Sequence, residues 1–336
     1  MKFSKKNSAR PLLSIRLMTY NHFNYIEEAL KGIDIQITKF TFEVVVGDDF
    51  STDGTLDKIK NYQFLNQNLQ LKILKRKIGD NYWKSRQQKG RLYNFQNIIE
   101  NCKGKYIALL DGDDYWTDPL KLQKQVDFLE ANPEFILCFT NNKILGENLE
   151  IAKEAAVNHS RSVFTHNDMP LFAPTSTRVF RNAYLKGFDM KDSPGGDTFL
   201  LIWQSKFGKI KFLNEVTSVY RSHAGGIYSS KSFEEQIIHL IYTRIAVIKI
   251  LEPSQLLKFY SIIFKLILEL KENNAGYRKI YKCLRDFNSA HRKTKKAFTV
   301  KERILIRKLF LIFFVPKSHK WKVVRKLSNP LLAELY

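Results

Sequence analysis

Acidic residues follow strand-like stretches at two places in the first third of the chain. Asp111-Gly112-Asp113-Asp114 comes directly after the apolar run 106–110, and Asp48-Asp49 comes directly after the stretch 42–47. A short apolar run is typical of a strand buried on both faces, and open α/β sheets bind ligands beyond the carboxyl ends of such strands. Two carboxylates one residue apart can bind a hard divalent cation, which can bridge a nucleotide's diphosphate. The sequence therefore indicates a site for a metal ion and phosphate.

The Asp111-x-Asp113 motif is short, and in isolation it is also typical of an ordinary acidic turn. Its position after a buried strand, beside the aromatic pair Tyr115-Trp116, favours a binding role. The acids at 48 and 49 suit recognition of a base or ribose through N–H and O–H donors. A third strand end, at residues 17–22, belongs to the same edge of the predicted sheet. We expect the three strand ends to converge on one site.

The elements that must position these residues alternate along the chain. Strand-like and helix-like stretches alternate from residue 12 to about 140, which predicts βαβ units and a largely parallel sheet. Residues 141–175 are expected to be loop-rich, and the chain after 232 helical. The predicted strands are 13–18, 42–46, 69–74, 106–110, 135–139, 177–181 and 209–220, and the predicted helices are 25–35, 55–64, 88–100, 119–130 with Asp118 as N-cap, and 197–207.

Composition narrows the class of protein. A chain of 336 residues that is 44% hydrophobic can form a large α/β domain with an appendage. Its three cysteines are widely spaced and form no CxxC pair, which predicts buried thiols in a reducing compartment. The first ten residues lack the apolar segment of a secretory signal, and no apolar run is long enough to span a membrane. We therefore expect a cytoplasmic protein.

The positive charge is concentrated near the C-terminus. The net charge is +22, and residues 273–326 hold 17 Lys or Arg against two acids, which gives +15. Within this segment, residues 304–315 and Trp321 resemble an interfacial helix, which predicts peripheral contact with the inner face of the cytoplasmic membrane. A helix packed on the catalytic domain with a solvated basic face is the alternative. Nucleic acid is not expected as a partner, because the aromatic residues here form an apolar stripe instead of interleaving with the charges.

Three motifs in order resemble those of family 2 inverting glycosyltransferases with the GT-A fold. The resemblance covers roughly residues 10–225. It implies a GT-A catalytic domain over 10–230, with nucleotide-sugar binding in about 10–140 and the acceptor part in about 141–230, followed by a basic helical region over 231–336. The motifs are Thr19-Tyr20-Asn21, Gly47-Asp48-Asp49-x-Ser51-x-Asp53-Gly54-Thr55, and Gly104-Lys105-Tyr106-Ile107-Ala108-Leu109-Leu110-Asp111-Gly112-Asp113-Asp114.

The resemblance also implies roles for the donor-site residues. Thr19, Tyr20 and Asn21 belong to the nucleotide-sugar site, and Tyr20 with Asp49 or Asp48 would hold the nucleoside. Asp111 and Asp113 would be the metal-binding pair on the ribose and diphosphate, and Gly112 between them would belong to the nucleotide-sugar site. The cation would be Mn²⁺ or Mg²⁺.

Further along the chain the family has an acid at a helix start that deprotonates the acceptor hydroxyl. Asp197 fits this position, although Gly196 stands where many relatives have another acid, and Asp197 could be only an N-cap. His223 could be a third metal ligand or could hold the diphosphate, and Arg221 could neutralise charge on the leaving group. A histidine after a strand can equally be a packed residue.

These residues predict transfer of a sugar, UDP-linked in most members of the family, to a hydroxyl of a glycan or lipid-linked acceptor. We expect a role in cell-surface polysaccharide synthesis. The Gln-x-x-Arg-Trp motif of processive relatives is absent, which indicates addition of one or a few sugars. One alternative is a nucleotidyltransferase, but residues 13–22 lack the glycines of a triphosphate-binding loop. The other is a protein that binds an anionic polymer or nucleic acid through the basic C-terminal region.

Overall fold

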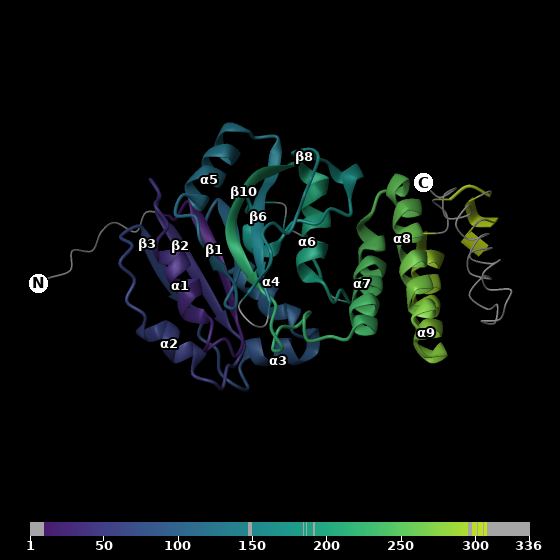
Figure 1. Ribbon diagram of the computed structural model, residues 1–336, viewed down its shortest axis with the longest axis horizontal. Helices are drawn as coiled ribbons and strands as arrows, with labels where there is room; N and C mark the ends of the chain where they lie inside the picture. Colours follow the sequence, from purple (N-terminus) through teal and green to yellow (C-terminus); the bar gives the residue numbers. More distant parts are fainter. Residues whose placement is uncertain are drawn as a thin grey trace, which may run out of the picture. The chain divides into compact units, whose positions relative to one another are not determined.

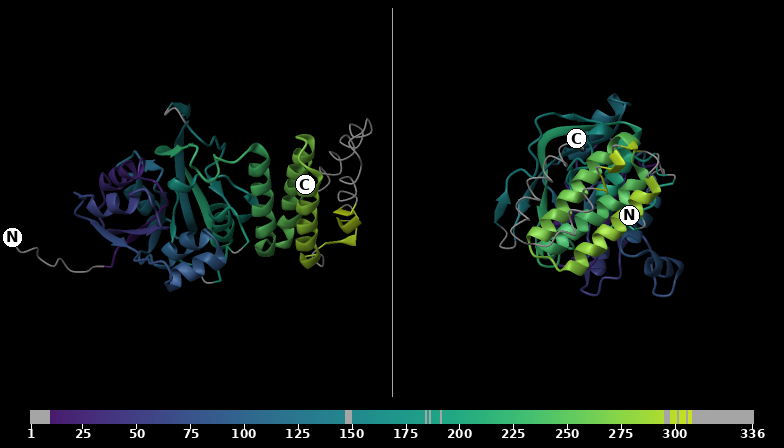
Figure 2. Two further views of the ribbon diagram at one scale, coloured as in Figure 1. Left: turned by 90° about the horizontal axis from the view of Figure 1, so that it is seen from below. Right: turned by 90° about the vertical axis from the view of Figure 1, so that its right-hand side faces the viewer.

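The computed structural model describes residues 10–146, 150–183, 185, 187–190, 192–294, 298–300, 302–304 and 306–307 (Figures 1 and 2). Contacts between residues divide the chain into two units. The sheet unit comprises residues 10–190 with Leu200–Ser229, and the helical unit comprises Asp192–Phe199 with the residues from 230 onward. The fold is α/β with a helical C-terminal region, as the sequence predicts.

The sheet unit is built on one mixed sheet, which has ten strands in the described part of the chain. The strands are β1 Leu13–Thr19, β2 Phe42–Asp48, β3 Leu69–Ile73, β4 Tyr106–Asp111, β5 Tyr115–Trp116, β6 Phe135–Leu145, β7 Ile151–Lys153, β8 Val163–Phe164, β9 Val179–Arg181 and β10 Lys209–Arg221. Their order is β3-β2-β1-β4-β9-β6-β10-β5, with β7 beside β6 and β8 beside β10. Strands β1 to β4 are parallel to one another where they pair, so their carboxyl ends share one edge.

Helices cover both faces of this sheet (Figure 1). The helices are α1 Ile26–Asp34, α2 Thr55–Asn61, α3 Asn81–Lys89, α4 Leu92–Glu100, α5 Lys121–Ala131 and α6 Gly196–Gln204, with 3-10 turns η1 His166–Asp168, η2 Thr175–Thr177 and η3 Ser205–Phe207. Side chains alternate between the faces of a strand, and Leu13, Ile15 and Leu17 of β1 share one core with α1 and α5. Arg16 points to the other face, where its guanidinium lies 4.5 Å from the Phe95 ring centroid of α4.

Three predictions of local structure differ most from the structure. The helix expected over 88–100 begins only at Leu92, as α4, because Gly90 with φ +79° ends a preceding helix, α3, which the sequence analysis did not predict. Asp118 is not the N-cap of α5: its Oδ1 accepts from the Leu120 N–H at 2.8 Å, and the helix begins only at Lys121. Residues 141–175 are less loop-rich than expected, since β6 runs on to Leu145 and β7 and β8 follow.

One charged side chain is buried inside the sheet unit. Lys121 of α5 is fully buried, and its Nζ donates to Gln125 Oε1 at 2.6 Å and lies 4.6 Å from the Trp116 ring centroid. Burial lowers the pKa of Lys121 to about 7. The three cysteines are free thiols and are buried, which confirms their predicted burial.

The helical unit contains α7 Phe233–Val247, the turn η4 Ile248–Ile250, α8 Pro253–Glu272 and α9 Tyr277–Thr294, which pack against one another (Figure 2). Tyr260 and Phe264 of α8 contact Phe287 of α9 in its core. Within the described residues, none of the helices is long and apolar enough to cross a membrane. Most of the predicted interfacial segment 304–315, and Trp321, lie outside the described residues.

Candidate active site at the carboxyl edge of the sheet

The three predicted strand ends do converge. β1 lies between β2 and β4, with Thr19 in register with Asp48 and Met18 in register with Asp111. Gly112 follows at once, and its N–H donates to Met18 O at 2.9 Å. A Cβ at Gly112 would lie 2.7 Å from Thr19 Cγ2 and 2.8 Å from His22 Nδ1, so this turn needs glycine. The rim of the sheet is therefore closely packed around the predicted site.

Asp48 and Asp49 have different surroundings. Asp48 is only 6% exposed, and its carboxylate accepts from Thr19 Oγ1 at 2.9 Å, Ser51 Oγ at 2.5 Å and the Ser51 N–H at 2.9 Å. These bonds join the end of β1 to the loop after β2. Asp48 is thus enclosed within the protein. Asp49 is also hydrogen-bonded, but its partner Arg86 is 25% exposed, which makes Asp49 the more accessible candidate for contact with a nucleoside.

Asp49 contacts side chains from α3 that the sequence analysis missed. Arg86 Nε donates to Asp49 Oδ2 at 2.8 Å, and Tyr82 Oη donates to Oδ1 at 2.9 Å. The Arg76 guanidinium lies 3.7 Å from the Tyr82 ring centroid and donates to the backbone oxygen of Asp48 at 2.8 Å. No sequence motif marks these residues, because their position depends on the way α3 folds back over the loop after β2.

The Thr19-Tyr20-Asn21 motif combines structural and exposed residues. Asn21 has φ +53°, and its Oδ1 accepts from the Thr52 N–H at 2.9 Å while its own N–H donates to Ser51 Oγ at 2.9 Å. Asparagine tolerates this left-handed backbone better than most residues. Tyr20 next to it is 56% exposed and is available for a ligand.

The acidic cluster is surrounded by cationic and imidazole groups. Asp111 Oδ1 accepts from Arg16 Nη1 at 2.6 Å, with Arg16 fully buried and the Asp111 side chain 27% exposed. Asp113 Oδ2 lies 3.3 Å from His223 Nε2 and 3.6 Å from His22 Nε2. Of these partners, only His223 belongs to the site residues that the sequence indicates. Arg16 and His22 carry no motif of their own, although an arginine in an apolar run is itself unusual.

Asp114 and Arg221 brace the same turn. Asp114 is 4% exposed, and its Oδ1 accepts from the Arg221 N–H at 3.1 Å, which ties the acidic turn to the end of β10. Arg221 Nη1 donates to the backbone oxygen of Asp113 at 2.7 Å, and Nη2 pairs with Glu28 of α1. The guanidinium also lies 4.5 Å from the Tyr115 ring centroid. Arg221 is therefore held within the protein, and its predicted action on a leaving group stays a prediction.

The carboxyl groups of the cluster titrate differently from one another. Burial raises the pKa of Asp111, against the opposing effect of Arg16. Burial acts in the same direction on Asp113, but the hydrogen bond from His223 and the charge of His22 outweigh it and lower the pKa of Asp113. Burial, with the charges of Asp113 and Asp111, raises the pKa of Asp114 well above its usual range. The three acids thus have unequal tendencies to ionise.

The residues at this turn are of the right types for a hard divalent cation. Carboxylate oxygens suit Mg²⁺ and Mn²⁺, and Asp111 and Asp113 supply them beside the imidazoles of His22 and His223. In the described part of the chain, no three His, Cys, Asp or Glu side chains are arranged as a metal site. The assignment of Asp111, Asp113 and His223 as metal ligands therefore stays a prediction.

The predicted base, Asp197, is the second residue of α6 and lies in its first turn, so it is not the N-cap of the helix. It belongs to the segment Asp192–Phe199, which groups with the helical unit. A Cβ at the neighbouring Gly195 would lie 2.8 Å from Thr243 Oγ1 of α7, so the entry to α6 packs closely against that helix. The role of Asp197 as a base stays a prediction.

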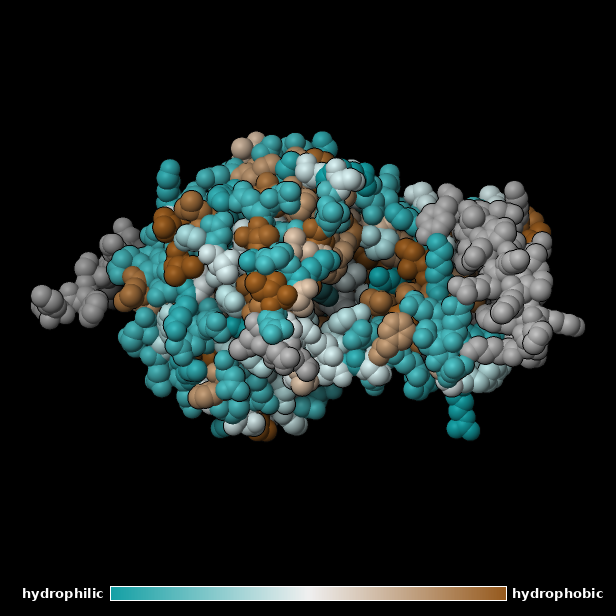
Figure 3. All heavy atoms as spheres, viewed as in Figure 1, coloured by the Kyte–Doolittle hydropathy of each residue, from teal (hydrophilic) through white to brown (hydrophobic). Residues whose placement is uncertain are grey.

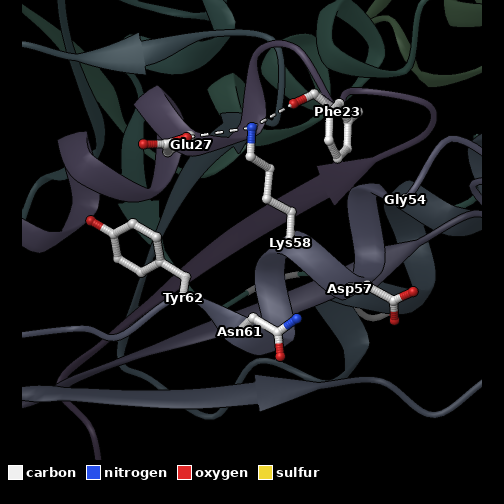
Figure 4. Close-up of a pocket in the computed structure, with 7 residues that line it drawn as sticks. All are labelled: Phe23, Glu27, Gly54, Asp57, Lys58, Asn61 and Tyr62. Atoms are coloured by element: carbon white, nitrogen blue, oxygen red, sulfur yellow. Dashed lines mark hydrogen bonds and ion pairs between the residues drawn. The ribbon is translucent and has the colours of Figure 1, made fainter.

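An open depression of about 470 Å³ lies beside the site, between α1 and α2 (Figure 4). Lys58 crosses it, with Nζ 3.1 Å from the backbone oxygen of Phe23 and 3.4 Å from Glu27 Oε2. The depression contains none of the predicted site residues, and its central cation already has partners in the protein. We therefore place the candidate site at the rim of the sheet.

The sheet order and the acid-bearing ends of β2 and β4 beside the end of β1 define a GT-A type α/β protein. Residues 14–188 match the model of glycosyl transferase family 2, and the chain belongs to this family. The protein Rv1520 of Mycobacterium tuberculosis (strain ATCC 25618 / H37Rv) and the protein Mb1547 of Mycobacterium bovis are each 33% identical to it over 232 residues. The match covers 65% of this chain and spans only 61% of those relatives.

Solved structures show the same fold. The structure of S. aureus TarS 1-349 in complex with UDP-GlcNAc has a TM-score of 0.60 at 19% identity and covers 95% of this chain and 91% of that chain. The mannosyltransferase PcManGT from Pyrobaculum calidifontis, in complex with GDP-Man and Mn²⁺, has a TM-score of 0.54 at 16% identity and covers 98% and 86%. These similarities confirm the fold predicted from the sequence.

Proposed function

We propose that the protein transfers a sugar from a nucleotide diphosphate sugar to a hydroxyl of a glycan or lipid-linked acceptor, with inversion and with a divalent metal. The observation that carries this proposal is the convergence of Asp49, Asp111 and Asp113 at one edge of a sheet in a family 2 member. Family membership favours glycosyl transfer over the nucleotidyltransferase alternative. The complexes of TarS with UDP-GlcNAc and of the mannosyltransferase with GDP-Man and Mn²⁺ support a nucleotide-sugar donor and a metal.

In this proposal each part of the donor has residues of suitable chemistry. Tyr20 and Asp49 hold the nucleoside, since one is exposed and the other presents a carboxylate that can accept from a base N–H. Asp111 and Asp113, with His223, hold Mn²⁺ or Mg²⁺. The bound ion would stabilise the charge of the departing diphosphate.

Asp197 acts in the proposal as the general base. It takes the proton of the acceptor hydroxyl while the acceptor oxygen forms a bond to the anomeric carbon and the bond from that carbon to the diphosphate oxygen breaks. The products are the glycoside with inverted configuration, the nucleoside diphosphate and a protonated Asp197. The proton later passes to solvent.

Two measurements on the full chain test this function. A thermal-shift screen of UDP- and GDP-sugars with Mn²⁺ should identify a donor that raises the unfolding temperature, because a ligand of the native state stabilises it by mass action. With that donor, Asp197→Asn should lose transfer at least 100-fold, the lower end of the range for general-base catalysis, while binding the donor like the parent. Transfer by Asp197→Asn at the parental rate would show that another group is the base.

Asp192→Asn is a matched control for this variant. Asp192 lies five positions before Asp197 and has φ +74°, a backbone conformation that asparagine tolerates. The same loss of one carboxylate at this position should leave both donor binding and transfer unchanged. An equal loss of transfer in the two variants would show that the substitutions disturb the segment 192–199, and that Asp197 has no catalytic role.

We further propose that the helical unit contacts the inner face of the cytoplasmic membrane as a peripheral surface. Between Tyr277 and Thr294, α9 has six Lys or Arg and one acid, Asp286. Its solvent face has Tyr277 and Tyr281, 66% and 48% exposed, among exposed cations, whereas its apolar face packs into the unit. Hydrophilic residues predominate over α9 on the face shown in Figure 3. Each cation near an anionic membrane surface contributes about 1 kcal/mol.

Flotation with anionic vesicles tests the membrane contact. The triple variant Arg278→Glu, Lys282→Glu, Arg292→Glu changes three exposed cations of α9 and should lose flotation. The control changes three exposed lysines of the sheet unit to Glu, namely Lys39, Lys60 and Lys153, and should float like the parent. Equal flotation of all three proteins would refute a role for α9.

A further inference from the structure

Arg16 is a charged residue at the centre of the sheet. It lies on β1 between Val45 of β2 and Leu109 of β4, and its exposed fraction is 0%. Removing an ionised group from water costs several kcal/mol unless other groups compensate. An apolar residue would fill this position without that cost, so the charge itself calls for an explanation.

The partner of Arg16 is the first acid of the Asp111-x-Asp113 motif. Nη1 donates to Asp111 Oδ1 at 2.6 Å. The Phe95 ring lies 4.5 Å from the guanidinium carbon on the α4 face of the sheet. Nε and Nη2 are buried and have no hydrogen-bond partner in the described part of the chain. Asp111 is therefore the one ion-pair partner of Arg16 found among the described residues.

The pair reaches from the core to the site. Arg16 is completely buried, whereas the Asp111 side chain is 27% exposed. The arginine thus binds one carboxylate oxygen from inside the sheet while part of the carboxylate remains accessible. A charge-assisted hydrogen bond of this kind is short and directional, and it restricts rotation of the carboxylate about its last torsion. An acid that would otherwise sample several orientations is held in one.

We propose that Arg16 is a positioning residue for the donor site: it orients Asp111 so that the carboxylate meets the metal–nucleoside diphosphate already arranged to bind it. The proposal rests on the proposed function, since it assigns Asp111 to that ligand. The affinity for this ligand is higher because the carboxylate loses no orientational freedom when the ligand binds. Groups that orient a metal site's carboxylates in this way typically affect affinity 10- to 100-fold.

Calorimetric titration of the full chain with UDP and with GDP, each with Mn²⁺, tests the proposal. Arg16→Met should raise the Kd of the nucleotide that binds the parent by about 10- to 100-fold. Arg16→Lys should give an intermediate Kd, because it keeps the charge but not the planar fork. Ser14→Ala is the control: Ser14 is buried on the same face of β1 and bonds Glu43 at 2.6 Å, away from the acidic turn. It should bind like the parent.

A double-mutant cycle separates positioning from a purely structural role. In an Asp111→Asn background, Arg16→Met should change the Kd by less than about 2-fold, because no carboxylate is left to orient. A structural role predicts the same loss in both backgrounds and would overturn the proposal. If Arg16→Met does not fold, Arg16→Lys is measured in both backgrounds, and the same comparison decides.

The outcomes also distinguish this inference from the proposed function. If the parent chain binds neither nucleotide with Mn²⁺, the proposed function is wrong and the inference is wrong with it. If the parent binds a nucleotide and the Arg16 variants bind it equally well, the inference alone is refuted. A higher Kd for the Arg16 variants that depends on Asp111 supports both.

Discussion

Exchanging a carboxylate for an amide at Asp48 and at Asp49 should have opposite consequences, although the residues are adjacent. Asp48 is 6% exposed and accepts three hydrogen bonds, two from Ser51 and one from Thr19. In Asp48→Asn one oxygen becomes an NH₂ group. Facing the Ser51 N–H, it sets a donor against a donor; facing the Thr19 and Ser51 hydroxyls, it forces both to turn and accept, and the bonds lose their charge assistance. Hydrogen bonds to charged groups contribute about 1.5–3 kcal/mol each, so the free energy of unfolding should fall by about 2–3 kcal/mol. At roughly 2–4 °C per kcal/mol for a unit of this size, Tm should fall by about 4–12 °C.

Asp49→Asn should instead affect binding. Its carboxylate bonds Arg86 and Tyr82, and the Arg86 side chain is 25% exposed, so the free energy of unfolding should fall by less than in Asp48→Asn. The lost carboxylate would be an acceptor for a base N–H, so the nucleotide Kd should rise about 10-fold or more. Scanning fluorimetry gives the Tm of each variant, and calorimetry gives its Kd for the nucleotide. A parental Tm with lost binding for Asp48→Asn, and the reverse for Asp49→Asn, would refute the assignment.

Three further predictions follow from buried groups. The pKa of Lys121 is about 7 in the folded protein and about 10.4 in an unfolded chain. Between these values the unfolded state binds more protons, so the free energy of unfolding should rise with pH, by about 3 kcal/mol from pH 7 to pH 10. Urea unfolding of Lys121→Met should not show this rise. Gly112→Ala sets a Cβ 2.7 Å from Thr19 Cγ2, and calorimetry should show nucleotide binding weakened at least about 10-fold. Burial raises the pKa of all three cysteines, so mass spectrometry should detect no maleimide adduct on the native protein at pH 7 and three after denaturation.

The sequence predicts the sheet rim well because two local signals coincide there. Apolar runs identify β1, β2 and β4, and acids stand at the residues where the runs of β2 and β4 end. Parallel strands bring such ends together whatever the loops do, so Asp48, Asp49 and Asp111 could be placed without knowledge of side-chain contacts. The order of the strands beyond β4 could not be predicted in this way, because β9, β6 and β10 pair across long stretches of chain.

The partners of the acids could not be predicted, because they depend on tertiary packing. Arg86 and Tyr82 reach Asp49 from α3, a helix whose separate existence depends on the break at Gly90. Arg16 is visible in the sequence as a charge in an apolar strand, but nothing local shows that it faces Asp111 on a neighbouring strand. The structural role of Asp48 and the proposed binding role of Asp49 likewise depend on tertiary packing, because the loop that contains Ser51 encloses only the Asp48 carboxylate.

The arrangement of charges at the rim provides an argument for metal dependence that is independent of the motif. Three arginines described at this edge already pair with a protein acid: Arg16 with Asp111, Arg86 with Asp49, and Arg221 with Glu28. A fourth, Arg76, donates to the backbone oxygen of Asp48 and to Asn97. A diphosphate placed beside Asp111 and Asp113 would therefore add negative charge to a site whose described arginines are already engaged. A divalent cation held by Asp111 and Asp113 would supply positive charge that offsets this repulsion. Accordingly, UDP or GDP should raise Tm in the presence of Mn²⁺ and leave it nearly unchanged in EDTA, and an equal rise in both conditions would show that the protein's own cations suffice.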